Sequence, residues 1–370
     1  MFDVLCFSRR CVSNSHSGAS GRRSLRFLVI GSGFGEQHLL WLDECPDHEP
    51  VLLGYHRNAA RAHALARRFS IGVVDDLLSV ISSGEVDAVA VASPPGMHEE
   101  SVLAALDAGL AVVSDKPLTT DVASAERLVE RARSAGAVTA VTFQWRANPA
   151  LRELRSIVLS GHLGDVLHVD LEAQHDFLAG PTTAWPWRHR WETASAGALA
   201  DQGVHLFDQL QWLVPGNWSV TAGAAVVAFD QRSSIDGTVE CHTEDVAEVL
   251  LASDHSQARV FVSRVSAGHR VVRVRVLGTR GQATVSASPD DGSAVLDTIL
   301  DGVANGGTRF GPSSMNPYAA LFGLDGSSTA DFAAGLTAQV LLDDALRLGC
   351  GKPLRTTGRR TGRDREHLKT

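Results

Sequence analysis

Asp201 and His205 place a carboxylate and an imidazole four positions apart in the chain. Residues at this spacing share one face of a helix, so we expect the two side chains to lie together. Imidazole can accept a proton near neutral pH, and the carboxylate can orient it or bind a substrate. A surface Asp–His pair fits the same spacing. A metal site with His189 and Asp208 also fits, but no further ligand pattern supports it and we expect no metal.

Lys116 is a second candidate for chemistry, in the motif Asp115-Lys116-Pro117 directly after the apolar run Ala111–Ser114. Most lysines lie on the protein surface. At the carboxyl end of a central parallel strand, however, a lysine points toward the edge of the sheet where ligands bind. We therefore expect Lys116, with Asp115 beside it, at the ligand cleft.

The segment Ala184–Trp191 is rich in tryptophan and arginine. Flat apolar rings beside a cation suit the face of a sugar. Trp187 and Arg188 are therefore predicted to bind substrate, and core packing of the tryptophans is the alternative interpretation.

A glycine-rich turn between an apolar run and a helical pattern predicts a dinucleotide site. Its residues are Gly31, Ser32, Gly33, Phe34 and Gly35. Such a turn brings the backbone close to a pyrophosphate and aims a helix N-terminus at it. The motif G-x-G-x-x-G would have its third glycine where this chain has Glu36, so Gly35 is expected to take part of that role. The alternative is a plain strand-to-helix turn.

Two further segments are expected at the cofactor. His56 and Arg57 follow the second apolar run, where an NAD site usually has an acidic residue for the ribose. An arginine there would pair with a 2′-phosphate, which favours NADP over NAD; stacking on adenine or exposure to solvent is the alternative for Arg57. Ser93, Pro94 and His98 follow the fourth run, where a rigid turn is the alternative.

The elements that would position these residues follow a regular pattern up to about residue 142. Six apolar runs have the character of buried strands: Leu25–Ile30, Val51–Tyr55, Gly72–Val74, Ala88–Ala92, Ala111–Ser114 and Val138–Thr142. Helical patterns separate them: Asn58–Phe69, Asp75–Ser82, Glu99–Ala108 and Asp121–Ala135. Repeated βαβ units predict an α/β fold with a doubly wound parallel sheet.

After residue 150 the predicted strands are longer and alternate between apolar and polar residues, which indicates a large, mostly antiparallel open sheet in an α+β domain. They are Val166–Ala173, Val220–Phe229, Val246–Ser253, Arg259–Val265, Val271–Leu277 and Ala283–Ala287, the last two joined by a hairpin. Helices are expected at Leu151–Ser160 and Asp331–Leu348. Such a sheet has one face to bury, so we expect a second copy of the chain to cover it.

The composition is that of an ordinary globular protein of two domains, with 370 residues, 44% hydrophobic and 21% charged. The net charge of -8 argues against a nucleic-acid partner. No run approaches the roughly 18 apolar residues of a membrane helix. The five scattered cysteines are interpreted as reduced thiols in a cytoplasmic protein.

The ordered set of motifs resembles the Gfo/Idh/MocA oxidoreductase family over about residues 25–355. The motifs are Gly31-Ser-Gly-Phe-Gly35 with His38, Ser93-Pro-Pro with His98, Asp115-Lys-Pro117, and Asp201-Gln-Gly-Val-His205 with Asp208. The resemblance implies an NAD(P)-binding Rossmann domain, predicted at residues 25–145, and a substrate and oligomerisation domain at 146–354 that packs into homodimers or homotetramers. Residues 1–24 and 355–370 are expected to be disordered.

The resemblance also implies roles for single residues. Lys116 matches the family lysine that lies near nicotinamide and substrate, and the following Pro117 is often in a cis bond; Asp115 replaces the usual glutamate. His205 matches the general acid/base, and Asp201 the carboxylate that binds substrate or orients the reacting hydroxyl. The substrates are typically sugars, sugar derivatives or cyclitols, so the sequence predicts an NAD(P)-dependent dehydrogenase or reductase.

Two rival functions come from the same resemblance. One is a glycosidase that holds NAD tightly and oxidises its substrate transiently. The other is a nucleotide-sensing regulator without catalysis, which would not need Lys116 and His205 together. Net turnover of the cofactor would separate the three.

Overall fold

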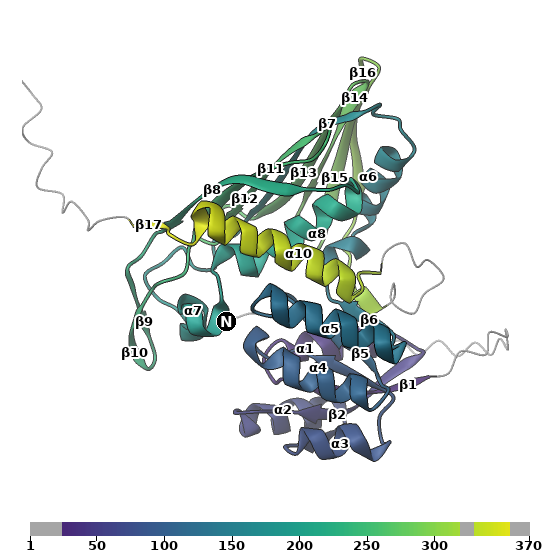
Figure 1. Cartoon of the computed structure of the whole chain (residues 1–370), viewed down its shortest axis with the longest axis vertical. Helices are drawn as coiled ribbons and strands as arrows, with labels where there is room; N and C mark the ends of the chain where they lie inside the picture. The colour runs from purple at the N-terminus through teal and green to yellow at the C-terminus, as the bar shows by residue number, and fades with distance from the viewer. Residues whose placement is uncertain (1–23, 319–328, 356–370) are drawn as a thin grey trace, which may run out of the picture.

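The computed structural model describes residues 24–318 and 329–355, which form two large sheets with helices packed on them and a separate two-stranded hairpin (Figure 1). The predicted extension 1–24 lies outside the described residues except for Ser24, and so does the predicted tail 355–370 except for Arg355. Arg355, which was expected in the tail, belongs to the strand Leu354–Arg355. Across the described ranges, we find no helix that is long and apolar enough to cross a membrane.

The first sheet has six parallel strands in the order β3-β2-β1-β4-β5-β6, which confirms the predicted doubly wound sheet. Its strands are β1 (Leu25–Ile30), β2 (His48–Gly54), β3 (Gly72–Val74), β4 (Ala88–Val91), β5 (Ala111–Ser114) and β6 (Thr139–Val141). Its helices are α1 (Gly35–Asp43), α2 (Ala59–Phe69), α3 (Leu77–Ser83), α4 (His98–Asp107) and α5 (Val122–Ala135). The strand order reverses between β1 and β4, and ligands bind at the carboxyl ends of strands at such a point.

Local chemistry explains where these elements begin and end. All four residues of β4 are buried, as expected of a parallel strand covered on both faces. Asn58 and Asp121 cap α2 and α5, because their side-chain oxygens accept the N–H groups of Arg61 and Ser124 at 3.0 and 2.9 Å. Gly136 ends α5 in the left-handed region at φ 60°.

The second sheet has nine strands in the order β16-β15-β14-β13-β7-β12-β11-β8-β17. Only the pairs β7–β12 and β8–β17 are parallel, which confirms a mostly antiparallel sheet. The strands are β7 (Val166–Gln174), β8 (Ser219–Val227), β11 (Val246–Ala252), β12 (Gln257–Ser263), β13 (Val271–Gly278), β14 (Gly281–Ala287), β15 (Ala294–Leu300), β16 (Val303–Phe310) and β17 (Leu354–Arg355). β15, β16 and β17 were not predicted, nor was the separate hairpin of β9 (Gln231–Ser234) and β10 (Gly237–Glu240).

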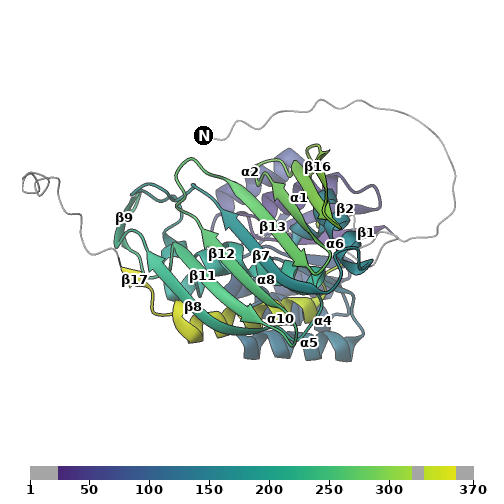
Figure 2. The same ribbon diagram turned by 90° about the horizontal axis from the view of Figure 1, so that it is seen from above.

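One face of the second sheet is covered by helices and the other is open. The covering helices are α6 (Pro149–Leu159), α8 (Val204–Leu213) and α10 (Phe332–Ala345). Figure 2 looks onto the open face, with α8 and α10 behind the strands. Residues that point toward the helices, such as Val169 and Leu171 of β7, are fully buried.

The open face is polar along its centre. Asp170 of β7 accepts from Arg259 at 3.1 Å and from Arg275 at 3.5 Å, and Glu172 accepts from Arg273 at 3.0 Å. A polar face of an antiparallel sheet can contact water. The polar centre of this face therefore does not by itself require a covering partner.

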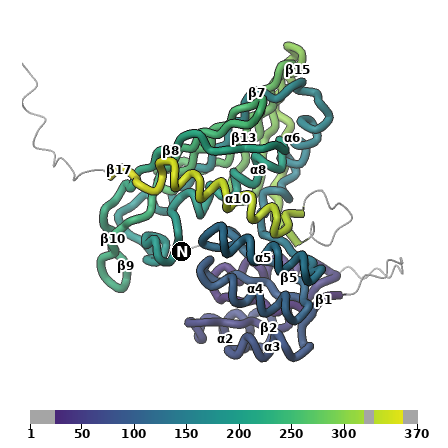
Figure 3. Tube along the Cα trace, in the orientation of Figure 1, coloured from purple at the N-terminus to yellow at the C-terminus, as the bar shows by residue number. Residues whose placement is uncertain are grey.

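Helix α10 packs against both sheets' helical layers (Figure 3). Asp331 caps it by accepting the Ala334 N–H at 2.9 Å. A Cβ at Gly335 would lie 2.8 Å from Val141 and 3.1 Å from Leu118, so this glycine permits close contact with the first domain. The helix continues into a short π-helical turn, so the predicted span Asp331–Leu348 is close to the observed one.

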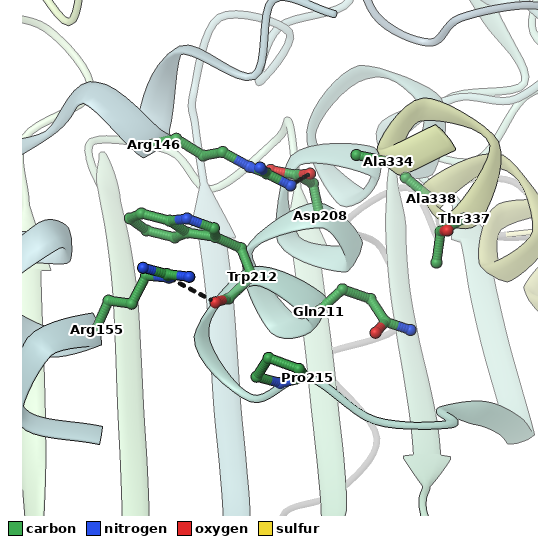
Figure 4. Close-up of a pocket in the computed structure, with 9 residues that line it drawn as sticks. All are labelled: Arg146, Arg155, Asp208, Gln211, Trp212, Pro215, Ala334, Thr337 and Ala338. Atoms are coloured by element: carbon green, nitrogen blue, oxygen red, sulfur yellow. Dashed lines mark hydrogen bonds and ion pairs between the residues drawn. The ribbon is translucent and has the colours of Figure 1, made fainter. Parts of the chain in front are cut away.

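A buried ion pair joins Asp208 of α8 to Arg146 (Figure 4). Arg146 donates to both oxygens of Asp208 at 2.5 and 2.8 Å. The Trp212 ring lies between the guanidinium groups of Arg146 and Arg155, beside a pocket of about 270 Å³. Burial raises the pKa of Asp208, and the Arg146 charge opposes that rise. Asp208 is thus a structural partner of Arg146 in this fold.

We expect Arg146→Met to lower the free energy of unfolding by about 3–5 kcal/mol at pH 7, because it leaves the Asp208 carboxylate buried without its cation. Urea unfolding would measure the loss. Arg155→Met is the matched control, since Arg155 stacks on the other face of Trp212 without pairing to Asp208. Equal losses in the two variants would contradict the assignment.

Candidate active site

The Asp201 carboxylate lies at the meeting point of the two domains. It belongs to a π-helical turn, Leu199–Gly203, that leads into α8. One of its oxygens accepts from Arg188 Nη1 at 2.6 Å and the other lies 3.3 Å from Lys116 Nζ, which also donates to the Asp201 backbone carbonyl at 2.5 Å. Burial alone would raise the pKa of Asp201, but the charges of Arg188 and Lys116 hold it well below its ordinary value. Asp201 is therefore an anion at neutral pH.

His205 lies on the first turn of α8 and is only 3% exposed. Its Nδ1 has no hydrogen-bond partner, and the Phe143 ring meets it edge-on at 5.8 Å. Burial lowers the pKa of His205 well below its ordinary value, with the Lys116 charge lowering it further and the Asp201 charge opposing this. A neutral imidazole can accept a proton at pH 7.

The structure decides between the interpretations of the Asp201–His205 spacing. The Asp201 side chain is 11% exposed and His205 is 3% exposed, so the surface pair is wrong. The Asp201 carboxylate makes its hydrogen bonds to Lys116 and Arg188 instead of the His205 ring. In the described ranges, no three His, Cys, Asp or Glu side chains gather into a possible metal site. His189 is buried against Thr183, and burial lowers its pKa to about 4.

The predicted substrate residues lie beside the predicted catalytic ones. Arg188 belongs to the short helical turn Pro186–His189, and its guanidinium stacks on Trp187 at 4.8 Å and on Trp185 at 5.6 Å. The contact of Arg188 with Asp201 brings this aromatic segment to the Lys116 side chain.

His175 is a site residue that the sequence reasoning missed. It follows the last residue of β7, is 9% exposed, and its Nε2 has no hydrogen-bond partner. Burial lowers its pKa, and it interacts electrostatically with Asp201 and Lys116. Phe177 packs edge-on against His175 at 5.8 Å. A polar residue directly after a strand, the signal that indicated Lys116, could also have indicated His175.

Buried polar and charged side chains fix the backbone of Arg188. Its backbone carbonyl accepts from Thr243 Oγ1 at 2.8 Å and from Arg264 Nη1 at 3.4 Å. Arg264 and Arg232 both donate to Asp245, at 2.8 and 3.2 Å, and all three are buried. This framework was also missed, because its partners lie far from Arg188 in the sequence.

The buried Glu244 fixes the start of the turn that carries Asp201. One of its oxygens accepts the N–H groups of Gly197 and Leu199 at 2.8 and 2.9 Å, at the start of the turn that carries Asp201. A Cβ at Gly197 would lie 1.9 Å from the Glu244 carbonyl, so only glycine fits there.

The glycine-rich turn fits a dinucleotide. Gly31 has φ +117°, and a Cβ there would lie 2.5 Å from the Ala92 carbonyl, so the turn approaches β4 as closely as backbone allows. A Cβ at Gly33 would meet nothing within 4 Å, which leaves that side open at the N-terminus of α1. A pyrophosphate binds at such a position.

The loops after β4 and β5 lie together. Ser93 is buried and its Oγ has no hydrogen-bond partner. Buried polar atoms are normally hydrogen-bonded, so this Oγ is available to a ligand. Asp115 accepts from the Lys116 backbone N–H at 2.8 Å and from Thr142 Oγ1 at 2.7 Å, and the Lys116–Pro117 bond is cis.

His98 needs a correction. It is fully buried, with Nε2 against the Ser93 carbonyl at 2.7 Å and Nδ1 against the Leu118 carbonyl at 3.2 Å. Both ring nitrogens thus contact protein, and His98 connects the two loops instead of contacting a cofactor. Pro94 lies in the same loop, while His56 and Arg57 are exposed after β2.

Comparison with known proteins adds to this geometry. Residues 25–143 match the family model described as "Oxidoreductase family, NAD-binding Rossmann fold", and residues 151–284 match the "GFO/IDH/MocA C-terminal domain".

The chain is similar to curated relatives and to solved structures. An inositol 2-dehydrogenase of Acidothermus cellulolyticus is 34% identical over 72% of this chain and 74% of that protein. A dTDP-3,4-didehydro-2,6-dideoxy-alpha-D-glucose 3-reductase of Streptomyces violaceoruber is 31% identical over 82% of this chain and 88% of that protein. A levoglucosan dehydrogenase solved with NADH and L-sorbose has a TM-score of 0.79 and 20% identity, over 88% of this chain and 96% of that one.

We expect Asp201→Asn to lower the free energy of unfolding at pH 7 by ~1.5–3 kcal/mol, because Lys116 and Arg188 lose a charged acceptor. The pKa of Asp201 is depressed in the folded protein, so its stabilisation is present above the ordinary pKa of about 4 and is lost as the pH falls. The difference from wild type should therefore shrink below about pH 4. Urea unfolding from pH 7 downward would measure it.

Asp107→Asn serves as the matched control, because Asp107 forms its ion pair with Arg131 on the exposed surface, where a pair is worth at most ~1 kcal/mol. A loss from Asp201→Asn no larger than that of the control would refute the role given to Asp201.

Proposed function

The chain belongs to the GFO/IDH/MocA oxidoreductase family, and on that basis we propose that it is an NAD(P)-dependent dehydrogenase or reductase of a sugar, sugar derivative or cyclitol. The reaction would transfer hydride between a nicotinamide cofactor and a hydroxyl or carbonyl carbon. The observation that carries the proposal is the contact of Lys116 with Asp201, beside a buried His205 with an unpaired ring nitrogen.

The substrate class is supported by the relatives and by the aromatic segment. The names of the relatives describe dehydrogenation of inositol and reduction of a didehydro-dideoxy-glucose nucleotide, so each acts on a hydroxyl or carbonyl carbon of a six-membered ring. Trp187 and Arg188 offer a flat ring and a cation beside Asp201, which suits such a ring. His175 adds an unpaired nitrogen for a further hydroxyl.

The charges of the site support the following proton steps. A bound nicotinamide would accept the hydride. His205, held neutral by burial, would take the proton of the substrate hydroxyl. The Lys116 ammonium would stabilise the negative oxygen that develops. Asp201 would hold Lys116 in place and remain ionised.

The cofactor is proposed to bind on the glycine-rich turn and the loops that carry Ser93, Asp115 and Lys116. We propose NADP in preference to NAD, because Arg57 is exposed at the end of β2 where an acidic residue would contact the ribose of NAD.

The chain is also proposed to form homodimers or homotetramers through the open sheet face. Leu250, Leu277 and Ile299 are 46%, 38% and 38% exposed there, around the ion pairs of the central strands. Apolar side chains grouped around a polar centre suit a contact between two copies.

We expect His205→Ala to lower kcat by roughly 10²–10⁴-fold, the usual worth of a positioned acid/base group. Cofactor affinity should barely change, because His205 lies on the second domain. Lys116→Ala should lower kcat and also weaken cofactor binding. Steady-state kinetics with a sugar or cyclitol substrate, together with cofactor titration, would measure both effects.

The control is His162→Ala, which removes an exposed imidazole and should leave kcat unchanged. A His205→Ala enzyme within a few-fold of wild type would end its assignment as the base.

We expect light scattering at micromolar concentration to give at least twice the chain mass of 39.4 kDa. Leu277→Glu should shift the protein toward monomer, because it places a charge in the proposed contact. Leu78→Glu changes an exposed leucine of α3 and should leave the mass unaltered. A monomeric wild type would exclude the proposed assembly.

A further inference from the structure

Glu36 stands where the glycine motif would have its third glycine, and its side chain binds α2. One carboxylate oxygen accepts from Arg61 Nη2 at 2.8 Å and the other from Arg68 Nη1 at 2.5 Å. The close helix packing that a third glycine serves falls to Gly35, because a Cβ there would lie 3.3 Å from Val29 Cγ1. Position 36 is therefore available for a side chain that connects α1 to α2.

Arg61 is fixed at a second point, inside the glycine-rich turn. Its Nε donates to the backbone carbonyl of Ser32 at 2.5 Å. These contacts use Nε and Nη2 and do not involve Nη1, and the side chain is 49% exposed. A planar guanidinium held through two nitrogens is pre-organised to offer the third to an anion.

The fold places Arg61 close in sequence and space to Arg57. Asn58 caps α2 by accepting the Arg61 N–H, so Arg61 lies in the first turn of the helix that follows Arg57. In dinucleotide-binding sheets, the glycine-rich turn is followed by a second strand, and a residue at the end of that strand contacts the adenosine ribose. Where the cofactor carries a 2′-phosphate, an arginine nearby accommodates it. Arg57 would reach this place from the end of β2, and Arg61 from the rim of the turn.

We propose that Arg61 is a second ligand, beside Arg57, for the 2′-phosphate of NADP. This inference rests on the proposed function, which supplies the dinucleotide. Nη1 of Arg61 donates to a phosphate oxygen while the Ser32 carbonyl and Glu36 hold the guanidinium, and hydrogen bonds between guanidinium and phosphate are among the strong ones. The Glu36 carboxylate faces Arg61 and Arg68, which leaves it badly placed to serve as the ribose acceptor of an NAD site.

Two matched variants test this. Arg61→Gln and Arg68→Gln each remove one of the two cations bound to Glu36, but only Arg61 contacts the glycine-rich turn. Calorimetric titration at one salt concentration should compare NADP, NAD and adenosine 2′,5′-bisphosphate, with no turnover required. We expect Arg61→Gln to weaken NADP and the bisphosphate by 10- to 100-fold and NAD by less than threefold, and Arg68→Gln to change every affinity by less than threefold.

Each other result has a distinct meaning. Equal losses of NADP and NAD affinity in Arg61→Gln would show that Arg61 only supports the glycine-rich turn. Equal losses of NADP affinity in Arg61→Gln and Arg68→Gln would show only a general electrostatic effect of positive charge. Either result overturns the inference. A wild-type preference for NAD would overturn it while leaving the proposed dehydrogenase intact. Failure of the wild type to bind either dinucleotide would overturn the proposed function itself.

Discussion

The site depends on one anion shared by two cations. The Asp201 carboxylate contacts Lys116 of the first domain and Arg188 of the second, and all three side chains are largely shielded from water. Buried cations are costly without a partner, so Lys116 and Arg188 can approach each other only because Asp201 lies between them. The lysine of the cofactor domain is thus positioned by charge balance across the domain junction as well as by its own loop.

The remainder of the second domain keeps that anion and its partners in place. Asp245 neutralises Arg264, and Arg264 in turn contacts the backbone of Arg188. Glu244 binds the start of the turn that carries Asp201. The residues directly before β11 therefore support the cluster through contacts with the Arg188 backbone and with the start of the turn that carries Asp201.

Local patterns predicted the first domain well, because buried parallel strands and helix caps such as Asp121 are determined by neighbouring residues. They also singled out Lys116, Asp201, His205 and Arg188, which lie close together in the fold. The pairing of Lys116 with Asp201 could not be predicted, since it joins positions far apart in the chain. β16 was missed because its glycine-rich, exposed sequence, Val303–Phe310, lacks an apolar alternation. Arg146 was missed because only the packing on α8 reveals its partner.

The charge arrangement also gives the site a direction for proton transfer. Asp201 is ionised and engaged by Lys116 and Arg188, so it is a poor proton acceptor, whereas the buried His205 is neutral. If His205 is the proposed base, the positive charge that it gains would be favoured by Asp201 and disfavoured by burial and by Lys116, while the oxygen that lost the proton would be favoured by Lys116. Lys116 would therefore act in two ways: it would favour the negative oxygen, as fixed groups do when they stabilise a transition state, and it would help to return the proton from His205 once the reaction is complete.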